Sequence, residues 1–179
     1  MLVQLSGVPG SGKSTLARGL SATTGLVVVD TDVLKSALID GGVAVAVAGR
    51  PAYLAALALA EDLLAQGRSV VVDSPCRYPA LLDAGRDIAR DAGVRYAFIE
   101  LWATEVSFLL ARLDTRTPRI SQVASATEPV VGTEWELGTP EATLRTWQSQ
   151  LVRPDEDWLR LDAQQPAASI LADALTYLR

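Results

Sequence analysis

The sequence contains no histidine and a single cysteine, Cys76. Within this chain, a Ser–His or Cys–His nucleophile is therefore excluded, and so is a zinc site built from the usual imidazole and thiolate ligands. One cysteine cannot form an internal disulfide and gives no sign of an oxidising compartment. Because Cys76 has no histidine partner, we expect a small buried or idle thiol rather than a nucleophile. Carboxylates remain the side chains best suited to proton transfer.

Long apolar runs are also missing, because the hydrophobic stretches are short and are interrupted by glycine or by charge. The sequence therefore predicts neither a membrane span nor a signal peptide, and we expect a cytoplasmic protein. Positive charge is not in excess either, since 16 lysines and arginines stand against 21 aspartates and glutamates, for a net charge of −5. This balance argues against broad, sequence-independent binding to nucleic acid, but it does not exclude a local basic pocket.

What the sequence does contain is a phosphate-binding loop near its start. Residues 7–15 read Gly-Val-Pro-Gly-Ser-Gly-Lys-Ser-Thr and match the pattern G-x-x-x-x-G-K-[ST]. Glycines let backbone N–H groups turn around an anion, and the helix that follows points its positive end at the same place. Lys13 should reach the β- and γ-phosphates, and the Ser14 hydroxyl should bind Mg²⁺. The expected nucleotide-binding residues of the loop are Gly7, Pro9, Gly10, Ser11, Gly12, Lys13, Ser14 and Thr15.

Apolar segments of strand and helix type alternate along the rest of the chain. Buried strands are predicted at 2–5, 26–30, 69–73, 95–101 and 158–162. Helices are predicted after the loop and at 31–39, 51–66, 79–92, 105–116, 140–151 and 166–178. This alternation predicts an α/β fold with a parallel sheet covered on both faces. The small residues 43–49 fit a strand, a helix or a loop equally well.

Domain organisation follows from the length and from the pattern of the later residues. With 179 residues, 49% hydrophobic and 21% charged, the chain suits one domain spanning 1–179. Residues 117–138 are polar, contain proline and glycine, and are weakly patterned, which is typical of a mobile flap. Together with the end of the preceding helix, they are expected to form a lid over about 112–138.

Acidic residues follow two of the predicted strands. Asp30 ends the second strand, with Asp32 two residues later, and Asp73 ends the third. Ligands bind at the carboxyl edge of an open parallel sheet, which is also where the phosphate loop lies. Asp73 resembles a Walker B carboxylate for Mg²⁺, or else it caps the turn at 74–75. Two roles are open for Asp32, a carboxylate that acts in the site or the N-cap of the following helix. For Asp30, the role to be considered is orienting Lys13 or a metal-bound water.

The loop, taken together with Asp-Thr-Asp-Val-Leu-Lys at 30–35, resembles the small P-loop kinases grouped with polynucleotide kinase, chloramphenicol phosphotransferase and the zeta toxins. The resemblance extends to the helix at 53–64, the strand at 67–74 and the arginine-bearing helix at 110–116. It lies in order and local motif rather than close identity, and leaves out roughly 40–50 and 120–150. It implies a five-stranded parallel core of order 2-3-1-4-5 and transfer of the γ-phosphoryl group of ATP to a hydroxyl.

The same resemblance implies roles for individual residues. Asp32 would accept the proton of the acceptor hydroxyl, and Lys35, one helical turn later, would hold the acceptor. Arg112, Arg116 and Arg119 would supply cations from the lid, although arginines at a helix end are also explained by the helix dipole. Independently of the resemblance, phosphoryl transfer needs positioning and charge neutralisation by groups of these types.

Two further residues complete the expected acceptor site. Arg77 follows the third strand and is expected to touch the acceptor, unless it is simply a solvated arginine before a helix. Tyr53 belongs to the long helix that the resemblance covers and is expected to contact the acceptor too. We therefore expect ATP and Mg²⁺ as cofactors and a small-molecule hydroxyl as the acceptor, in a nucleoside, sugar, amino acid or antibiotic-like metabolite.

Other functions remain open from the sequence. A polynucleotide or RNA 5′-hydroxyl kinase would need a basic groove despite the net negative charge. A shikimate- or gluconate-type kinase fits the first strand and the Asp-x-Asp at 30–32, but a Gly-Gly-Arg element for a carboxylate substrate is absent from the sequence. A noncatalytic nucleotide-dependent switch is the third alternative, disfavoured for GTPases because the Asn-Lys-x-Asp guanine motif is missing. Oligomeric state is not predicted.

Overall fold

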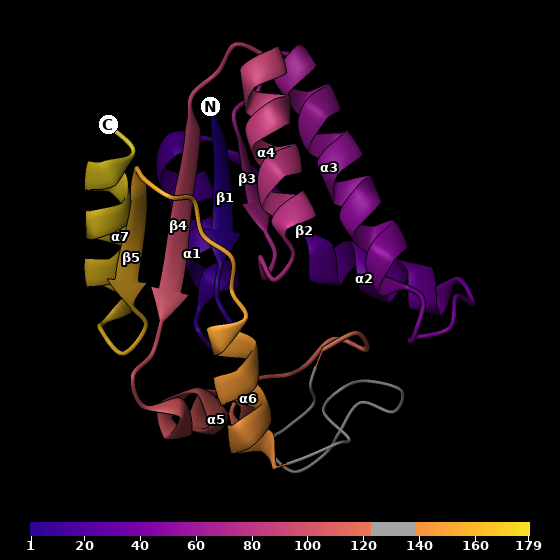
Figure 1. Ribbon diagram of the computed structural model, residues 1–179, viewed down its shortest axis with the longest axis vertical. Helices are drawn as coiled ribbons and strands as arrows, with labels where there is room; N and C mark the ends of the chain where they lie inside the picture. Colours follow the sequence, from indigo (N-terminus) through magenta and orange to yellow (C-terminus); the bar gives the residue numbers. More distant parts are fainter. Residues whose placement is uncertain (123–138) are drawn as a thin grey trace.

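The computed structural model describes residues 1–122 and 139–179, which form an α/β structure around one parallel sheet (Figure 1). The strands are β1 (Leu2–Ser6), β2 (Val27–Asp30), β3 (Val70–Asp73), β4 (Tyr96–Trp102) and β5 (Trp158–Asp162). The helices are α1 (Lys13–Thr24), α2 (Thr31–Asp40), α3 (Gly49–Ala65), α4 (Pro79–Asp91), α5 (Val106–Asp114), α6 (Pro140–Ser149) and α7 (Ala167–Tyr177). The five strands are ordered β2-β3-β1-β4-β5, so the predicted fold and sheet order are confirmed.

The parallel register brings the chemically important ends of the strands together. Asp73 at the end of β3 pairs with Leu5 of β1 on one side and with Asp30 of β2 on the other. The phosphate loop begins at Gly7, directly after the last residue of β1, Ser6. The carboxyl edge of the sheet therefore carries both the loop and the acidic residues, as expected for an open parallel sheet.

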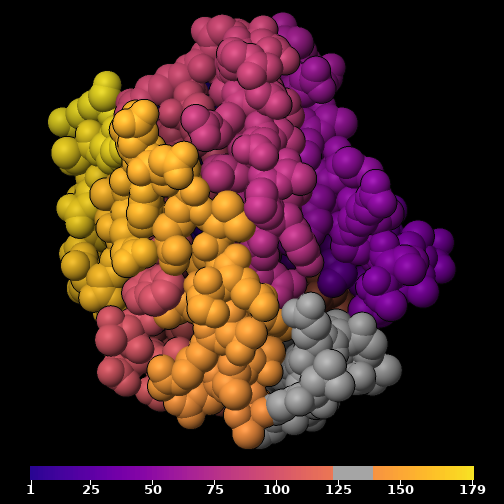
Figure 2. All heavy atoms as spheres, viewed as in Figure 1, coloured from indigo at the N-terminus to yellow at the C-terminus, as the bar shows by residue number. Residues whose placement is uncertain are grey.

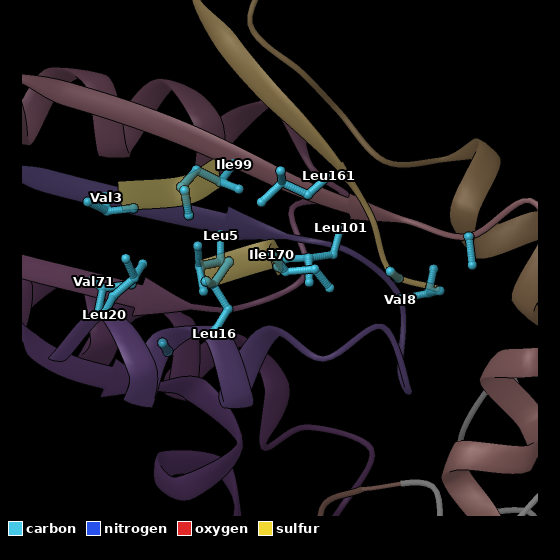
Figure 3. Close-up of a cluster of buried hydrophobic side chains, with 14 of the residues drawn as sticks. Val3, Leu5, Val8, Leu16, Leu20, Val71, Ile99, Leu101, Leu161 and Ile170 are labelled. Atoms are coloured by element: carbon cyan, nitrogen blue, oxygen red, sulfur yellow. The ribbon is translucent and has the colours of Figure 1, made fainter. Parts of the chain in front are cut away.

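Neighbouring residues of β1 point to opposite faces of the sheet, so this central strand contributes to two cores. Val3 and Leu5 pack with helices α1 and α7, and Figure 3 shows Leu16 and Leu20 of α1 and Ile170 of α7 gathered around them. Both side chains of β1 in this cluster are fully buried. This core fixes α1, and with it the helix end on which the phosphate loop depends.

The opposite face of the sheet is covered by α3 and α4. Leu2 of β1 packs there with Ala56, Ala60 and Leu64 of α3 and with Ala89 of α4. The alanines of α3 recur every four residues, which puts them on one side of the helix and lets it approach the strands closely. Helix α2 packs in turn on α3, so the position of α2 beside the loop depends on this second core.

The segment between α6 and β5 lies on the same face as α4. Val152 donates a backbone hydrogen bond to the Cys76 carbonyl at 2.8 Å and packs with Leu82 and Phe98. Figure 2 shows the segment between α6 and β5, in orange, lying against the pink atoms of α4. Cys76 is buried here, and burial raises the pKa of its thiol to about 12. The expectation of a buried thiol is confirmed, and its lack of reactivity stays a prediction.

Three details differ from or complete the predicted elements. Residues 43–48 form neither a helix nor a strand, with a turn at 45–47, and α3 begins at Gly49 rather than at Pro51. Helix α5 ends at Asp114, so Arg116 lies in the chain that follows it. The expected lid at 112–138 falls partly outside the described residues, because 123–138 are not among them. Over 1–122 and 139–179, no helix combines the length and the apolar character that spanning a membrane requires.

Candidate functional site

The phosphate loop turns in a conformation that requires glycine. Gly10 has φ +82° and Gly12, the N-cap of α1, has φ +96°, both in the left-handed region. A β-carbon on Gly10 would lie 2.7 Å from the carbonyl oxygen of Leu109, a backbone atom of α5. The loop is therefore packed directly against α5, and position 10 tolerates no side chain.

This packing yields a prediction with a matched control. Gly25, which ends α1, has a similar φ of +77° but no atom within 4 Å of an added β-carbon. Gly25→Ala should lower the free energy of unfolding by about 1–2 kcal/mol, because only the left-handed backbone is strained. Gly10→Ala should lower it further and weaken nucleotide binding, as measured by chemical unfolding and by titration calorimetry. Equal effects of the two variants would show that the contact with Leu109 is unimportant.

Lys13 points its ammonium group into the loop. The Nζ atom donates hydrogen bonds to the carbonyl oxygens of Gly7 at 2.8 Å and Val8 at 3.3 Å. Burial lowers the pKa of Lys13, while the charges of Asp73 and Asp32 act in the opposite direction. The side chain is thus a partly buried cation at the inside of an anion-binding loop, which is the environment expected of a phosphate-binding lysine.

Asp73 and Ser14 provide oxygen atoms suited to Mg²⁺. The Asp73 side chain is 4% exposed, and the Ser14 side chain forms a hydrogen bond with it. Burial raises the pKa of Asp73, while Lys13 and Ser14 lower it. Its Oδ2 atom is buried without a hydrogen-bond partner among the described residues. An unsatisfied carboxylate oxygen beside a serine hydroxyl fits a hard divalent cation.

A bound Mg²⁺ would take most of its ligands from phosphate oxygens and water rather than from protein side chains. Residues 1–122 and 139–179 contain no group of three or more aspartate, glutamate, cysteine or histidine side chains placed to hold a metal. This agrees with the usual behaviour of Mg²⁺, which is held by one or two protein groups and completes its shell with phosphate oxygens and water.

Asp30 and Asp32 have different roles in the structure. The Oδ1 atom of Asp30 accepts hydrogen bonds from the backbone N–H groups of Asp32 at 2.9 Å and Val33 at 3.3 Å, so Asp30 is the N-cap of α2. The alternative that Asp32 caps this helix is therefore wrong. The Asp32 carboxylate instead borders the main cavity and accepts a hydrogen bond from Gln122.

The main cavity, of about 870 Å³, lies between the phosphate loop, α2 and the chain after α5. The predicted site residues that line it are Pro9, Gly10, Gly12, Lys13, Ser14, Thr15, Asp32, Lys35, Arg77, Arg112, Arg116 and Arg119. Four other predicted residues are not among its lining: Gly7 and Ser11 lie within the loop, Asp73 is buried at the sheet edge, and Tyr53 belongs to α3. Most of the predicted site is thus brought to one cavity.

The charge of this cavity is opposite to that of the chain. Among its described lining residues, two are aspartates, Asp30 and Asp32, and seven are lysines or arginines. The seven are Lys13, Arg18, Lys35, Arg77, Arg112, Arg116 and Arg119. In a chain of net charge −5, such a concentration of cations favours a polyanionic ligand in the cavity.

Arg112 connects the phosphate loop to the far edge of the sheet. Its Nη1 atom donates to the carbonyl oxygen of Ala163, after β5, at 3.3 Å, and its guanidinium lies 5.3 Å from the Phe108 ring centre. A smaller hollow of about 190 Å³ lies beside it and is lined mainly by the loop, α1 and the start of α7. Ala167 and Leu171 supply apolar surface there.

Several lining residues were not predicted from the sequence. Trp147 of α6 stacks with Arg77, whose guanidinium carbon lies 4.9 Å from the Trp147 ring centre. Gln122, Arg18 and the small residues of the 43–49 segment also border the cavity. Arg77 and Trp147 are 70 positions apart in the chain, so no local pattern could have paired them. Arg18, one turn after Ser14 on α1, could have been found from helical spacing.

Tyr53 is close to the site without lining it. Burial raises the pKa of its hydroxyl above the usual value, and the charges of Arg77 and Asp32 also act on it. Its predicted contact with an acceptor stays a prediction, because Tyr53 is not among the residues that line the cavity.

Comparison with known proteins agrees with this arrangement. The family model described as an AAA domain matches residues 2–131. The uncharacterized proteins Rv2004c of Mycobacterium tuberculosis and Mb2027c of Mycobacterium bovis are each 34% identical to this chain over 105 residues, covering 50% of this chain. The chain spans only 20% of the length of either relative.

Solved structures are similar over nearly the whole chain. A sugar kinase of Janibacter sp. HTCC2649 has a TM-score of 0.68 at 22% identity, covering 99% of this chain and 93% of that one. A gluconokinase of Sinorhizobium meliloti 1021 has a TM-score of 0.64 at 23% identity, with 98% and 90% covered. The Mycobacterium tuberculosis APS kinase CysC, in complex with AMPPNP and APS, has a TM-score of 0.63 at 20% identity, with 99% and 96% covered. The chain belongs to the AAA domain family, and its sheet order is that of the P-loop kinase fold.

Proposed function

We propose that this protein is an ATP- and Mg²⁺-dependent kinase that transfers the γ-phosphoryl group to a hydroxyl of a small molecule. One observation carries the proposal. The carboxylate of Asp32 borders the same cavity as the phosphate loop, and it is not used to cap α2 because Asp30 does so. A carboxylate beside bound phosphates is what a hydroxyl nucleophile needs, while a binding module has no use for it.

The residues of the loop and the sheet edge hold the donor. The loop N–H groups and Lys13 bind the β- and γ-phosphates, and Ser14 with Asp73 holds Mg²⁺. When bound, the metal neutralises charge on the phosphate oxygens. Arg116 and Arg119, which border the cavity, supply further positive charge to the group in transfer.

Arg112 and the smaller hollow suit the nucleobase of ATP. The hollow opens beside Gly12 and Thr15 and is bordered by apolar residues at the start of α7. A flat base gains from burial against apolar surface, and the planar guanidinium of Arg112 can stack on it. That a solved neighbour, the APS kinase, binds AMPPNP supports ATP as the donor.

The acceptor lies on the side of Asp32. Asp32 takes the proton of the attacking hydroxyl, Lys35 and Arg77 hold the acceptor, and Tyr53 supports them from α3. The sugar kinase and gluconokinase among the structural neighbours support a small-molecule acceptor. A cavity of about 870 Å³ is large enough for a nucleotide and a small second substrate.

The finer affiliation with polynucleotide kinase, chloramphenicol phosphotransferase and the zeta toxins belongs to the same proposal. It also treats residues 1–179 as one kinase domain, with the lid at about 112–138. Within the lid, the structure describes residues 112–122. Three arginines of this stretch, Arg112, Arg116 and Arg119, line the cavity.

A transfer screen tests the proposal. The protein is incubated with γ-labelled ATP, Mg²⁺ and pools of nucleosides, sugars, amino alcohols, hydroxylated antibiotics and 5′-hydroxyl oligonucleotides. We expect label in a small-molecule pool, and no label when EDTA removes the metal, because Mg²⁺ is required for charge neutralisation. Label on the oligonucleotide would identify a nucleic-acid kinase. ATP binding without label in any pool would favour a nucleotide-dependent switch.

A further inference from the structure

The chain that follows α5 is attached to the first turns of α2 by side-chain hydrogen bonds. The Ser36 hydroxyl donates to the Ser121 hydroxyl at 2.8 Å, and the Ser121 hydroxyl donates to the Asp32 carbonyl at 3.1 Å. Both serines are buried, at 8% exposure each. A buried hydroxyl that lost its partner would destabilise the structure, so this pair holds the segment against α2.

The next residue, Gln122, contacts the carboxylate of Asp32 directly. Its Nε2 atom donates to Oδ2 of Asp32 at 2.6 Å, and its Oε1 atom accepts from the backbone N–H of Arg119 at 3.1 Å. The Arg119 N–H can only donate, so the amide oxygen of Gln122 must face it and the amide nitrogen must face Asp32. The orientation of the amide, and hence its donation to Asp32, is fixed from both sides.

This contact leaves one oxygen of Asp32 for chemistry. Oδ2 is held by Gln122, and within the described parts of the chain Oδ1 accepts no hydrogen bond. The backbone of Asp32 is fixed at its N–H by Asp30 and at its carbonyl by Ser121. The carboxylate is thus held by its backbone and by one of its two oxygens, while the other oxygen can accept a proton.

We propose that Gln122 is a positioning residue that orients the carboxylate of Asp32 for proton abstraction, and that Ser36 and Ser121 fix the segment that carries it. The inference rests on the proposed function, because it assigns Gln122 a role through Asp32. A base held in the wrong orientation remains in the site but loses alignment with the hydroxyl. The side-chain hydrogen bonds of Gln122 go to Asp32 and Arg119, and within the described residues none goes to the loop or to Lys13, so we expect ATP affinity to be independent of it.

The test compares two glutamines that make the same contact. Gln66 donates from Nε2 to Oδ2 of Asp62 at 2.6 Å on the exposed end of α3, away from the cavity. Gln122→Leu should lower kcat by roughly 10- to 100-fold with the KM for ATP unchanged, since misalignment at the reacting group has effects of this size. Gln66→Leu should leave both constants at wild-type values. If Gln122→Leu does not fold, Gln122→Asn retains the amide but shortens it by one methylene, and should also lower kcat.

A double-mutant cycle shows whether Gln122 acts through Asp32. In an Asp32→Asn background, Gln122→Leu should cause no further loss of transfer, because the group that it positions is already gone. An unchanged kcat in Gln122→Leu, or an equal loss in both backgrounds, would overturn the inference while the proposed function stands. A wild-type protein that phosphorylates no acceptor would remove the proposed function and this inference together.

Discussion

The Asp32→Asn variant is expected to bind ATP as the wild type does and to lose phosphoryl transfer by about 10²- to 10⁴-fold, the usual contribution of a general base. The structure gives the physical reason. Gln122 donates to Oδ2, so the asparagine would turn its amide oxygen toward Gln122 and its NH₂ group toward the acceptor. A donor would then occupy the position where an acceptor of the proton is required.

The measurement pairs ATP titration with initial rates on the acceptor that the transfer screen identifies. Asp40→Asn is the matched control, because Asp40 is the exposed last residue of the same helix. Its transfer rate should equal that of the wild type. An Asp32→Asn protein with unchanged rates would mean that Asp32 has a structural role at the start of α2 and that another group accepts the proton.

Replacing Lys13 with alanine should reduce both ATP binding and transfer. The ammonium group is partly buried in the loop, within hydrogen-bond distance of the Gly7 and Val8 carbonyl oxygens, and no other described side chain donates to them. We expect kcat to fall by at least about 10²-fold, the effect of removing one preorganised donor from a site of developing charge. Weaker ATP binding should be visible by calorimetry.

The Lys35→Ala variant tests whether acceptor binding and ATP binding depend on different residues of the cavity. Lys35 lines the same cavity but lies on α2, one helical turn after Asp32. Its loss should raise the KM for the acceptor and leave ATP affinity unchanged, because it is assigned to the acceptor. A fall in ATP affinity equal to that of Lys13→Ala would show that both lysines bind the nucleotide and that the acceptor lies elsewhere.

Local patterns were sufficient for much of the fold. The strand at Trp158–Asp162 and the start of α4 at Pro79 were predicted at the observed residues, since apolar runs and an N-terminal proline act through neighbours in the chain. The phosphate loop was predicted for the same reason: its glycines, lysine and serine must be adjacent to surround an anion. The position of Asp73 and Asp30 at one edge followed from parallel strands that end in acids.

Contacts between distant segments were not predictable in this way. Glu100, in the middle of β4, is fully buried and accepts hydrogen bonds from Arg153 at 2.6 Å and Arg160 at 3.0 Å. Both arginines also lie within 6 Å of the rings of Trp102 and Trp158. The fold thus stacks both arginines on two of the tryptophans, and Arg153 is far from Trp102 in the chain. A buried charge without such partners would be strongly destabilising.

The sequence alone therefore determined the class of fold, the order of its elements and the phosphate loop, because each depends on residues close together in the chain. Only the tertiary structure decided that Trp147 stacks on Arg77 and that Gln122 holds the Asp32 carboxylate. These contacts join side chains that meet only after the sheet and helices have packed. Such contacts leave no periodic pattern in the sequence.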